Sequence, residues 1–338
     1  MQLSDVYMLF VILPFTLYIL MDGYDLGIGM LTLFDRDTTR RREMYELVAW
    51  MWDGNGSWLV LFVVVLWCGF PLVIGVALPA LYVVLIPMLW AIIARGVATE
   101  LIDQHDGWHR IWGPLFSLGS LLAAFCQGAA FGGVVAGLGV RGSTFAGGPF
   151  TFLHHGYAVL TGFTAVALYL LAGCAWVYLK SDGELQRRVA RVGRVAIVAL
   201  AAGTAASWAL LTDAGTTTLH PGATARLPIW IVGAVLLGAG LVAGYASFRR
   251  APADGADGAP ALATATAYAG GLLVFGGLLY PHLVPPHITV HSAASPHATL
   301  LFIVIALAVI MPIILMYQTL GYRVFRGKVS IKHGEAVA

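Results

Sequence analysis

The stretch VYMLFVILPFTLYILMDGYDLGIGMLTLF, residues 6–34, decides how this chain folds. It is continuously apolar up to Met21, and a helix needs about 20 such residues to cross the hydrocarbon core of a bilayer. The run is too long for the apolar region of a signal peptide, and no basic segment precedes it. We therefore interpret it as a retained first transmembrane helix.

The rest of the chain repeats this pattern. Of its 338 residues, 59% are hydrophobic and only 11% are charged, whereas soluble domains carry about 25% charged residues. The runs are continuously apolar rather than alternating, which excludes transmembrane β-strands. We predict an all-α integral membrane protein, one transmembrane domain over 1–338. Its nine expected spans are 6–34, 45–68, 71–98, 113–139, 154–180, 194–212, 227–248, 261–283 and 298–322. A polar segment, 251–260, is expected to form a flexible cytoplasmic connector.

Basic residues predict the orientation of these spans. Seventeen of the 19 fall in the loops after spans 1, 3, 5 and 7 or in the C-terminal tail, and only Arg141 and Arg226 fall on the other side. Arg95 is counted in this set as part of the loop after span 3. Positive charge stays on the cytoplasmic side, so we expect an external N-terminus and a cytoplasmic C-terminus.

Charged groups inside the spans are few and clustered. Asp22 and Asp25 stand three residues apart in span 1, so they share one helix face. Asp53 lies in span 2, and Arg95 and Glu100 close span 3 on the same side. The sequence therefore predicts carboxylates from two helices meeting near one arginine at comparable depth.

Three interpretations of this cluster stay open. Ionisable groups in spans cost about 2.5–3.5 kcal/mol each on insertion scales, so their presence calls for a reason. The cluster could be an ion-pair network that fixes helix packing, a proton-uptake path, or a cation site. The neighbouring glycines are expected at close helix contacts; they are Gly23, Gly27, Gly29, Gly54 and Gly56.

Histidines and cysteines do not form an evident metal site. None of the ten histidines is central in an expected span, and His154 and His155 are the nearest to haem-ligand candidates. The three cysteines, Cys68, Cys126 and Cys174, lie far apart in apolar runs and are expected to be small packing residues. We expect no metal or haem to be ligated by this chain.

Four segments carry a resemblance to a known family. The strings MDGYDLGIGML, AWMWDGNGSWLV and ARGVATE fall in spans 1, 2 and 3, and MPIILMYQTLGYRVFRGKV falls in the last span and tail. They resemble the hallmark segments of subunit II of cytochrome bd-type, or cyanide-insensitive, quinol oxidases. Over about 130–290 the chain matches this family only in hydropathy and span count.

The resemblance implies a fold, partners and residue roles. The fold would be two four-helix bundles plus one extra helix. The partner would be subunit I, which carries haem b and haem d, or haem b only, oxidises quinol and reduces oxygen to water; a small single-span subunit is also conceivable. The complex would lie in the bacterial inner membrane. Residue by residue, Asp22 and Asp25 match the first-helix acidic pair, and Asp53 matches the acidic residue of the second-helix motif, which the family places on a proton route. Arg95 and Glu100 match the third-helix basic–acidic motif, and Trp58 matches a tryptophan proposed to line an oxygen path. Together with the residue pattern, this gives an expected proton path of Asp22, Asp25, Asp53 and Glu100, with Arg95 as a supporting charge.

Two other function classes fit part of the pattern. A proton- or cation-coupled secondary transporter would share membrane carboxylates and glycine-interrupted helices. We find no convincing internal repeat to support it. An assembly subunit without a transport role would share the fold but need no titrating side chain. Taken alone, Trp58 is better explained as a packing residue than as part of a site.

Overall fold

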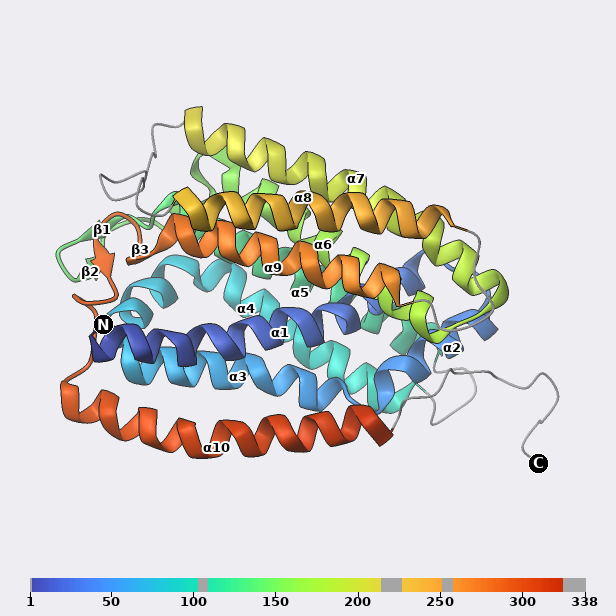
Figure 1. The fold of residues 1–338 in the computed structure, drawn as a ribbon, viewed down its shortest axis with the longest axis horizontal. Coiled ribbons are helices and arrows are strands. Elements are labelled where there is room, and N and C mark those ends of the chain that lie inside the picture. The colour runs from blue at the N-terminus through green and yellow to red at the C-terminus, as the bar shows by residue number, and fades with distance from the viewer. Residues whose placement is uncertain (1, 103–108, 214–226, 251–257, 325–338) are drawn as a thin grey trace.

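A computed structural model of the chain describes residues 2–102, 109–213, 227–250 and 258–324. Within these ranges the chain forms ten α-helices, one 3₁₀ helix and four short strands. Nine of the helices in the described ranges are long and apolar enough to cross a membrane, as the sequence predicts. Figure 1 shows the long helices lying roughly side by side, which is the arrangement that nine bilayer-crossing segments require.

The long helices group into two bundles. In the first, α1 packs on α3 and α5, and α4 packs on the same two helices. In the second, α6 contacts α7 and α9, and α8 contacts the same pair. The helices of the first bundle are α1 (Leu3–Leu33), α3 (Trp52–Gly69), α4 (Pro71–Leu101) and α5 (His109–Ala136). Those of the second are α6 (Tyr157–Lys180), α7 (Gly183–Asp213), α8 (Leu227–Arg249) and α9 (Ala259–Leu279).

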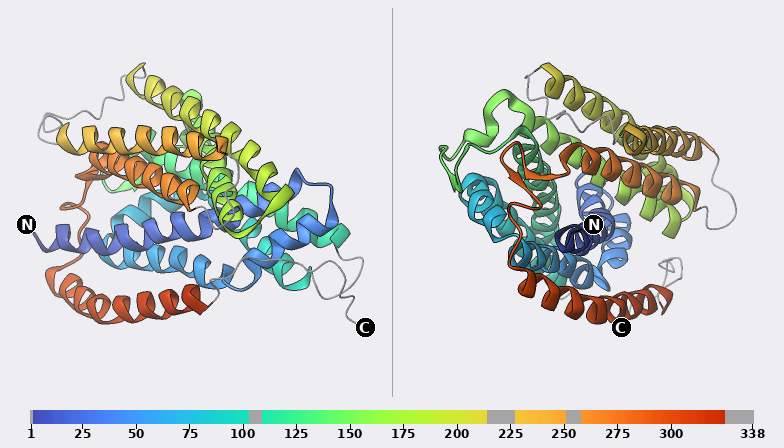
Figure 2. Two further views of the ribbon diagram at one scale, coloured as in Figure 1. Left: turned by 45° about the vertical axis from the view of Figure 1, so that its right-hand side comes forward. Right: turned by 60° about the vertical axis from the view of Figure 1, so that its left-hand side comes forward.

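The last helix, α10 (His297–Val324), belongs to neither bundle. It packs on α1 and α3, and Figure 2 shows it on the outside of the molecule, opposite α7 and α8. The expectation of two four-helix bundles plus one extra helix is thus confirmed.

The bundles meet where α1 crosses α6. A Cβ atom built on Gly27 would overlap the backbone of Gly173, and the reverse is also true, so only glycine permits this approach. The glycine prediction is wrong for Gly54 and Gly56 on α3, because a Cβ there meets nothing within 4 Å in this chain.

Several helix bounds differ from the expected spans. Residues 45–49 belong to a separate helix, α2 (Thr38–Ala49), and α3 begins only at Trp52. The carboxylate of Asp37 caps α2 by accepting from the Thr39 N–H at 2.9 Å. Helix α2 buries Met44, Tyr45, Leu47 and Val48. These apolar residues made 45–49 look like the start of a span, but they form the face of a separate helix that packs on the bundle.

Two further bounds follow from amphipathic or irregular segments. Helix α7 begins at Gly183, eleven residues before the expected span at 194, because its first turns alternate buried apolar and exposed basic residues. Helix α9 ends at Leu279, and the chain continues into β3 (His282–Val284). Most of the expected connector 251–260 lies outside the described residues, and Ala259 and Pro260 already belong to α9.

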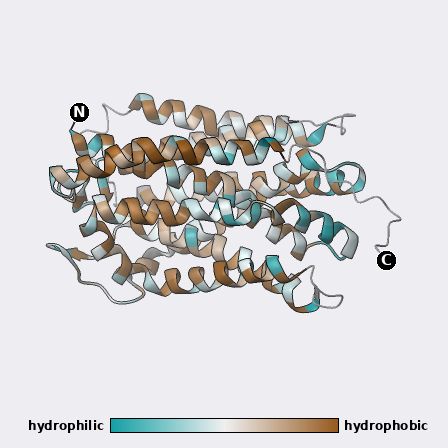
Figure 3. Ribbon diagram, turned by 90° about the horizontal axis from the view of Figure 1, so that it is seen from below, coloured by the Kyte–Doolittle hydropathy of each residue, from teal (hydrophilic) through white to brown (hydrophobic). Residues whose placement is uncertain are grey.

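Short elements cover the end of the bundle where α1 begins. They are the hairpin of β1 (Val140–Arg141) and β2 (Thr144–Phe145), the 3₁₀ helix η1 (Thr151–Gly156), and the hairpin of β3 and β4 (Ile288–Thr289). Figure 3 shows hydrophobic residues along the central lengths of the helices, with hydrophilic residues gathering towards the ends. This distribution is the one expected of a bilayer-spanning bundle.

Candidate functional site

A buried ion pair lies at the core of the first bundle. Asp22 of α1 and Arg95 of α4 are 1% and 2% exposed, and Arg95 Nη2 donates to Asp22 Oδ1 at 2.6 Å. Gly119 of α5 makes this burial possible, because a Cβ there would lie 2.9 Å from the carbonyl oxygen of Ala91, one turn before Arg95. Arg95 is therefore an interior residue of α4, and counting it among loop residues was wrong.

A second buried carboxylate, Asp25, stands one turn further along α1. It is 0% exposed, and its Oδ2 accepts a hydrogen bond from Asn55 Nδ2 of α3 at 2.8 Å. The other oxygen, Oδ1, has no partner among the described residues, and neither do Asp22 Oδ2, Arg95 Nε and Arg95 Nη1. Buried polar atoms are normally satisfied by protein or by ordered water. The two Arg95 nitrogens can only donate, so they would need an acceptor such as a water oxygen, whereas the two carboxylate oxygens accept hydrogen bonds.

The charges of this group do not balance when all three side chains are ionised. Two carboxylates face a single guanidinium, which leaves one net negative charge in the protein interior. A buried uncompensated charge is strongly disfavoured. Because Arg95 balances only one negative charge, ionising both carboxylates at once is electrostatically unfavourable.

Polar side chains continue from the group in two directions. Towards α10, Asn55 Oδ1 accepts from Gln318 Nε2 at 3.3 Å and from the Tyr322 hydroxyl at 2.9 Å. Towards the second bundle, the amide of Gln127 on α5 donates to the Tyr18 hydroxyl at 2.5 Å and accepts from the Tyr169 hydroxyl at 2.8 Å. Tyr18 lies four residues before Asp22, on the same side of α1. Sequence reasoning missed these uncharged links, because Asn, Gln and Tyr do not stand out in an apolar helix as carboxylates do.

Asp53 and Glu100 do not join the buried carboxylates. Asp53 is exposed in the first turn of α3, and Glu100 is exposed near the end of α4, where it accepts from Trp52 Nε1 at 3.1 Å. The prediction that carboxylates from two helices meet is therefore wrong. The cause is helical phase: residues two apart on a helix point about 200° apart, so Asn55 faces α1 and Asp53 faces outward.

Trp58 is buried at the junction of α3 and α10. Its side chain is 2% exposed, and its Nε1 donates to Gln318 Oε1 at 2.6 Å. It stands three residues after Asn55, so both residues lie on the inner face of α3. Trp58 thus belongs to the polar chain that reaches Asp25.

No described histidine side chain is buried. His291 contacts Ser4 through Nδ1 at 3.0 Å and lies 3.6 Å from Asp5 at the start of α1, so it ties the outer hairpin to that helix end. The side chains of His154 and His155 lie outside the described residues. Cys126 and Cys174 are buried and Cys68 is exposed, all three with free thiols.

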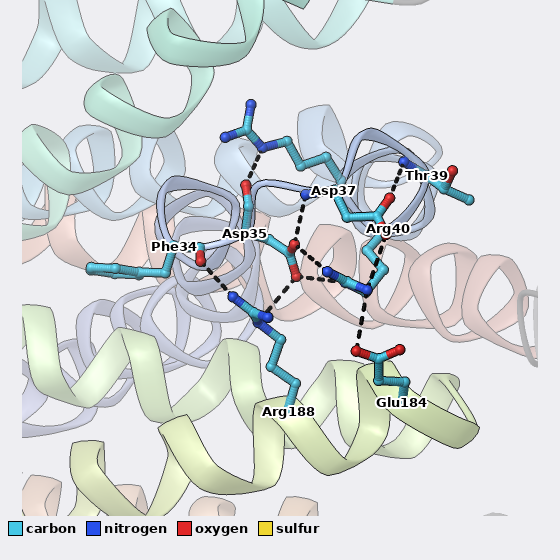
Figure 4. Close-up of polar contacts among 8 residues, drawn as sticks. Phe34, Asp35, Asp37, Thr39, Arg40, Glu184 and Arg188 are labelled. Carbon is cyan, nitrogen blue, oxygen red and sulfur yellow. Dashed lines mark hydrogen bonds and ion pairs between the residues drawn. The ribbon is translucent and has the colours of Figure 1, made fainter.

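A second ionic network, absent from the sequence prediction, fixes the turn between α1 and α2 (Figure 4). Asp35 is 2% exposed, and its carboxylate is bound by Arg40 Nε at 2.9 Å, Arg40 Nη2 at 3.0 Å and Arg188 Nε of α7 at 3.2 Å. Burial alone would raise the pKa of Asp35, but hydrogen bonds from Arg40 and the Asp37 N–H, with the charge of Arg188, lower this pKa below its ordinary value. The network joins the two bundles at the end where α2 lies.

The fold and the site define a class: a polytopic helical membrane protein with two buried carboxylates beside one buried guanidinium in one bundle. The family profile described as cytochrome bd terminal oxidase subunit II matches residues 3–325, and the chain belongs to this family. It is therefore one subunit of an oxidoreductase complex of the bd type, and a transporter is not favoured.

Individual relatives support the assignment. The chain is 26% identical over 351 residues to cytochrome bd ubiquinol oxidase subunit 2 of Bacillus subtilis, covering 98% of both chains. It is 29% identical over 182 residues to cytochrome bd-I ubiquinol oxidase subunit 2 of Escherichia coli, covering 52% of this chain and 48% of that one. A chain of the bd oxidase structure from Geobacillus thermodenitrificans shares the fold, with a TM-score of 0.76, 16% identity, and coverage of 96% and 99%.

Proposed function

We propose that this chain serves quinol oxidation coupled to oxygen reduction by conducting protons through the buried acidic group of Asp22, Asp25 and Arg95. The observation that carries the proposal is the charge imbalance of two buried carboxylates beside one guanidinium, with four of their own atoms lacking a hydrogen-bond partner among the described residues. Reduction of one oxygen molecule to two waters consumes four electrons and four protons. Protons cross hydrocarbon only along titrating or hydrated groups.

We assign different positions on this path to the exposed and the buried carboxylates. Asp53 and Glu100 are exposed, so they would collect protons at the surface. Asp25 and Asp22 would pass them on inside the first bundle. Trp58 retains its proposed place beside an oxygen path, although its sealed position and its bond to Gln318 favour packing equally.

The rest of the complex follows from family membership. Subunit 2 implies a subunit 1, which we propose holds haem b and haem d, or haem b only, together with the quinol site. The described side chains of this chain offer no buried histidine as an axial ligand. A small single-span subunit remains a further proposal.

We further propose that the complex lies in the bacterial inner membrane with an external N-terminus and a cytoplasmic C-terminus. Arginines of the α1–α2 turn and of the first turns of α7 lie at one end of the bundle, where Asp35 brings them together. Reporter fusions after Arg42 and after Arg250 should both report the cytoplasm. A periplasmic signal from either would contradict this orientation.

The proton path is tested by Asp53→Asn and Asp25→Asn in the complete complex. Each substitution keeps the shape of the side chain and removes the titrating group. We expect full haem content with slowed quinol-dependent oxygen consumption in both variants. Wild-type turnover of both across about pH 6–9 would refute the path, because proton delivery of this kind depends on titrating groups.

A further inference from the structure

The direction of the hydrogen bonds around Asp25 is set by a tryptophan. An indole N–H can only donate, so the side-chain amide of Gln318 must present its oxygen, Oε1, to Trp58, 2.6 Å away. The nitrogen of the same amide, Nε2, then faces Asn55 Oδ1 at 3.3 Å. Asn55 in turn must present Nδ2 to Asp25 Oδ2 at 2.8 Å.

Asn55 has no freedom to reverse this direction. Its Nδ2 donates to Asp25 and also to the Tyr24 hydroxyl at 2.7 Å, and its Oδ1 accepts from Gln318 and from the Tyr322 hydroxyl at 2.9 Å. Both hydrogens and both lone-pair directions of the amide are thus used. Tyr24 and Tyr322 also share a hydrogen bond between their hydroxyls. The residue is 0% exposed, so no solvent competes for these contacts.

We propose that the donor chain Trp58–Gln318–Asn55 positions the Asp25 carboxylate for proton transfer. This inference rests on the proposed proton path. The chain directs one N–H at Oδ2 and leaves Oδ1, which is buried and without a partner among the described residues, as the oxygen that accepts and releases the proton. Asn55 and Gln318 are positioning residues, since they act through Asp25.

Helix α10 supplies part of this donor chain. This helix packs on α1 and α3 outside both bundles, and its Gln318 and Tyr322 are the groups that reach Asn55. Other charged or titratable groups around Asp25 are Asp22 on its own helix, Arg95 from α4, and the tyrosines Tyr24 and Tyr322. From α6, Trp176 stacks on Tyr24 and Lys180 lies 5.3 Å from the centre of the Trp176 ring. The two tyrosine hydroxyls bond the Asn55 amide, but a hydroxyl can both donate and accept, so neither fixes its direction as Trp58 does through Gln318.

The test uses Gln318→Met, Asn55→Leu and Trp58→Phe in the complete complex with subunit I. Thr319→Val is the matched control, because Thr319 is the exposed neighbour of Gln318 and its hydroxyl donates to the Leu315 carbonyl of its own helix. Haem content reports assembly. The infrared carboxyl band that disappears in Asp25→Asn reports protonation of Asp25 across pH, and quinol-dependent oxygen consumption gives the pH profile.

Loss of the donor favours the protonated carboxyl. We expect Asn55→Leu to move the midpoint of the Asp25 band towards higher pH by about one unit, with the pH profile of turnover moving alongside. Gln318→Met, which leaves the Asn55 donor in place but removes the group that directs it, should move both in the same direction by less. Trp58→Phe should also move the band midpoint and the pH profile towards higher pH, by less than Asn55→Leu, because the Gln318 amide can then adopt either orientation. Thr319→Val should move neither.

The outcomes separate this inference from the proton path itself. If haem content is normal but the band and the profile stay in place in all three variants, the chain only packs helices and the inference is overturned. It is equally overturned if all three variants fail to assemble while Thr319→Val assembles. If Asp25→Asn turns over like wild type while the band still moves in Gln318→Met, the proton path fails but the positioning of Asp25 stands.

Discussion

Replacing Asp35 by Asn should destabilise the chain in a strongly pH-dependent way. Asp35 receives three bonds from two arginines at 2.9, 3.0 and 3.2 Å and is 2% exposed. The asparagine keeps the shape but leaves both guanidinium groups facing a neutral amide. Removing one partner of a fully buried pair costs about 3–5 kcal/mol. Arg40 and Arg188 are 19% and 36% exposed and retain Asp37, Glu184 and the Phe34 carbonyl, so we expect about 2 kcal/mol at pH 7.

The sign of the pH dependence follows from the lowered pKa of Asp35. A group whose pKa is lower in the folded chain stabilises folding above its unfolded value, about 3.9 for Asp, and this stabilisation is lost as the pH falls through the folded pKa. The wild type should therefore lose its advantage over Asp35→Asn as the pH falls below about 4. The free energy of unfolding is measured by titrating the chain in mixed micelles with a denaturing detergent.

Glu46→Gln is the matched control for Asp35→Asn. Glu46 lies 3.6 Å from Arg42 in an exposed pair, with side chains 38% and 61% exposed, and such pairs contribute about 0–1 kcal/mol. A difference between wild type and Asp35→Asn that stays constant from pH 3 to pH 7, or one no larger than that of Glu46→Gln at pH 7, would refute the reasoning.

Three further predictions concern the core and the cofactor. Gly27→Ala should lower the melting temperature and yield of the chain, because the added methyl overlaps the α6 backbone at Gly173 and overpacking costs about 1–3 kcal/mol or more; Gly54→Ala, which meets nothing within 4 Å, should not lower the melting temperature of the isolated chain. Arg95→Met should destabilise by about 3–5 kcal/mol, since Asp22 and Asp25 would be left buried without a positive partner. Combining it with Asp22→Asn should restore part of that loss, and no restoration would contradict the pairing. The chain expressed without subunit I should bind no haem, and stoichiometric haem in a pyridine haemochrome spectrum would contradict this.

Hydropathy is enough to predict most of the fold but little of the detail of the site. The nine spans could be predicted because apolar runs must be long enough to cross a bilayer, whereas their grouping into two bundles and one extra helix came from the resemblance to the family. Helix breaks were harder to predict. The break at Trp50–Met51 depends on α2 burying Met44 and Val48 beside the bundle, which an apolar run cannot distinguish from a continued span.

The sequence predicted the charged residues of the site but not how they are arranged. Asp22, Asp25 and Arg95 were found because buried charges are rare in spans, and the structure brings these three together. Asp53 and Asn55 are two residues apart, so only the phase of α3 decides which of them faces Asp25. Gln318 lies 260 residues after Trp58, and nothing in the local sequence indicates that pairing.

Proton uptake during a single turnover tests the central claim most directly. The complete complex, fully reduced and mixed with oxygen, is followed in the same experiment by the haem spectrum and by a pH-sensitive dye. We expect that Asp25→Asn retains full haem content and binds oxygen normally, while its proton uptake lags far behind that of the wild type. Proton uptake that keeps pace with electron transfer in Asp25→Asn, as in the wild type, would contradict the claim that the buried carboxylates of this chain carry the protons.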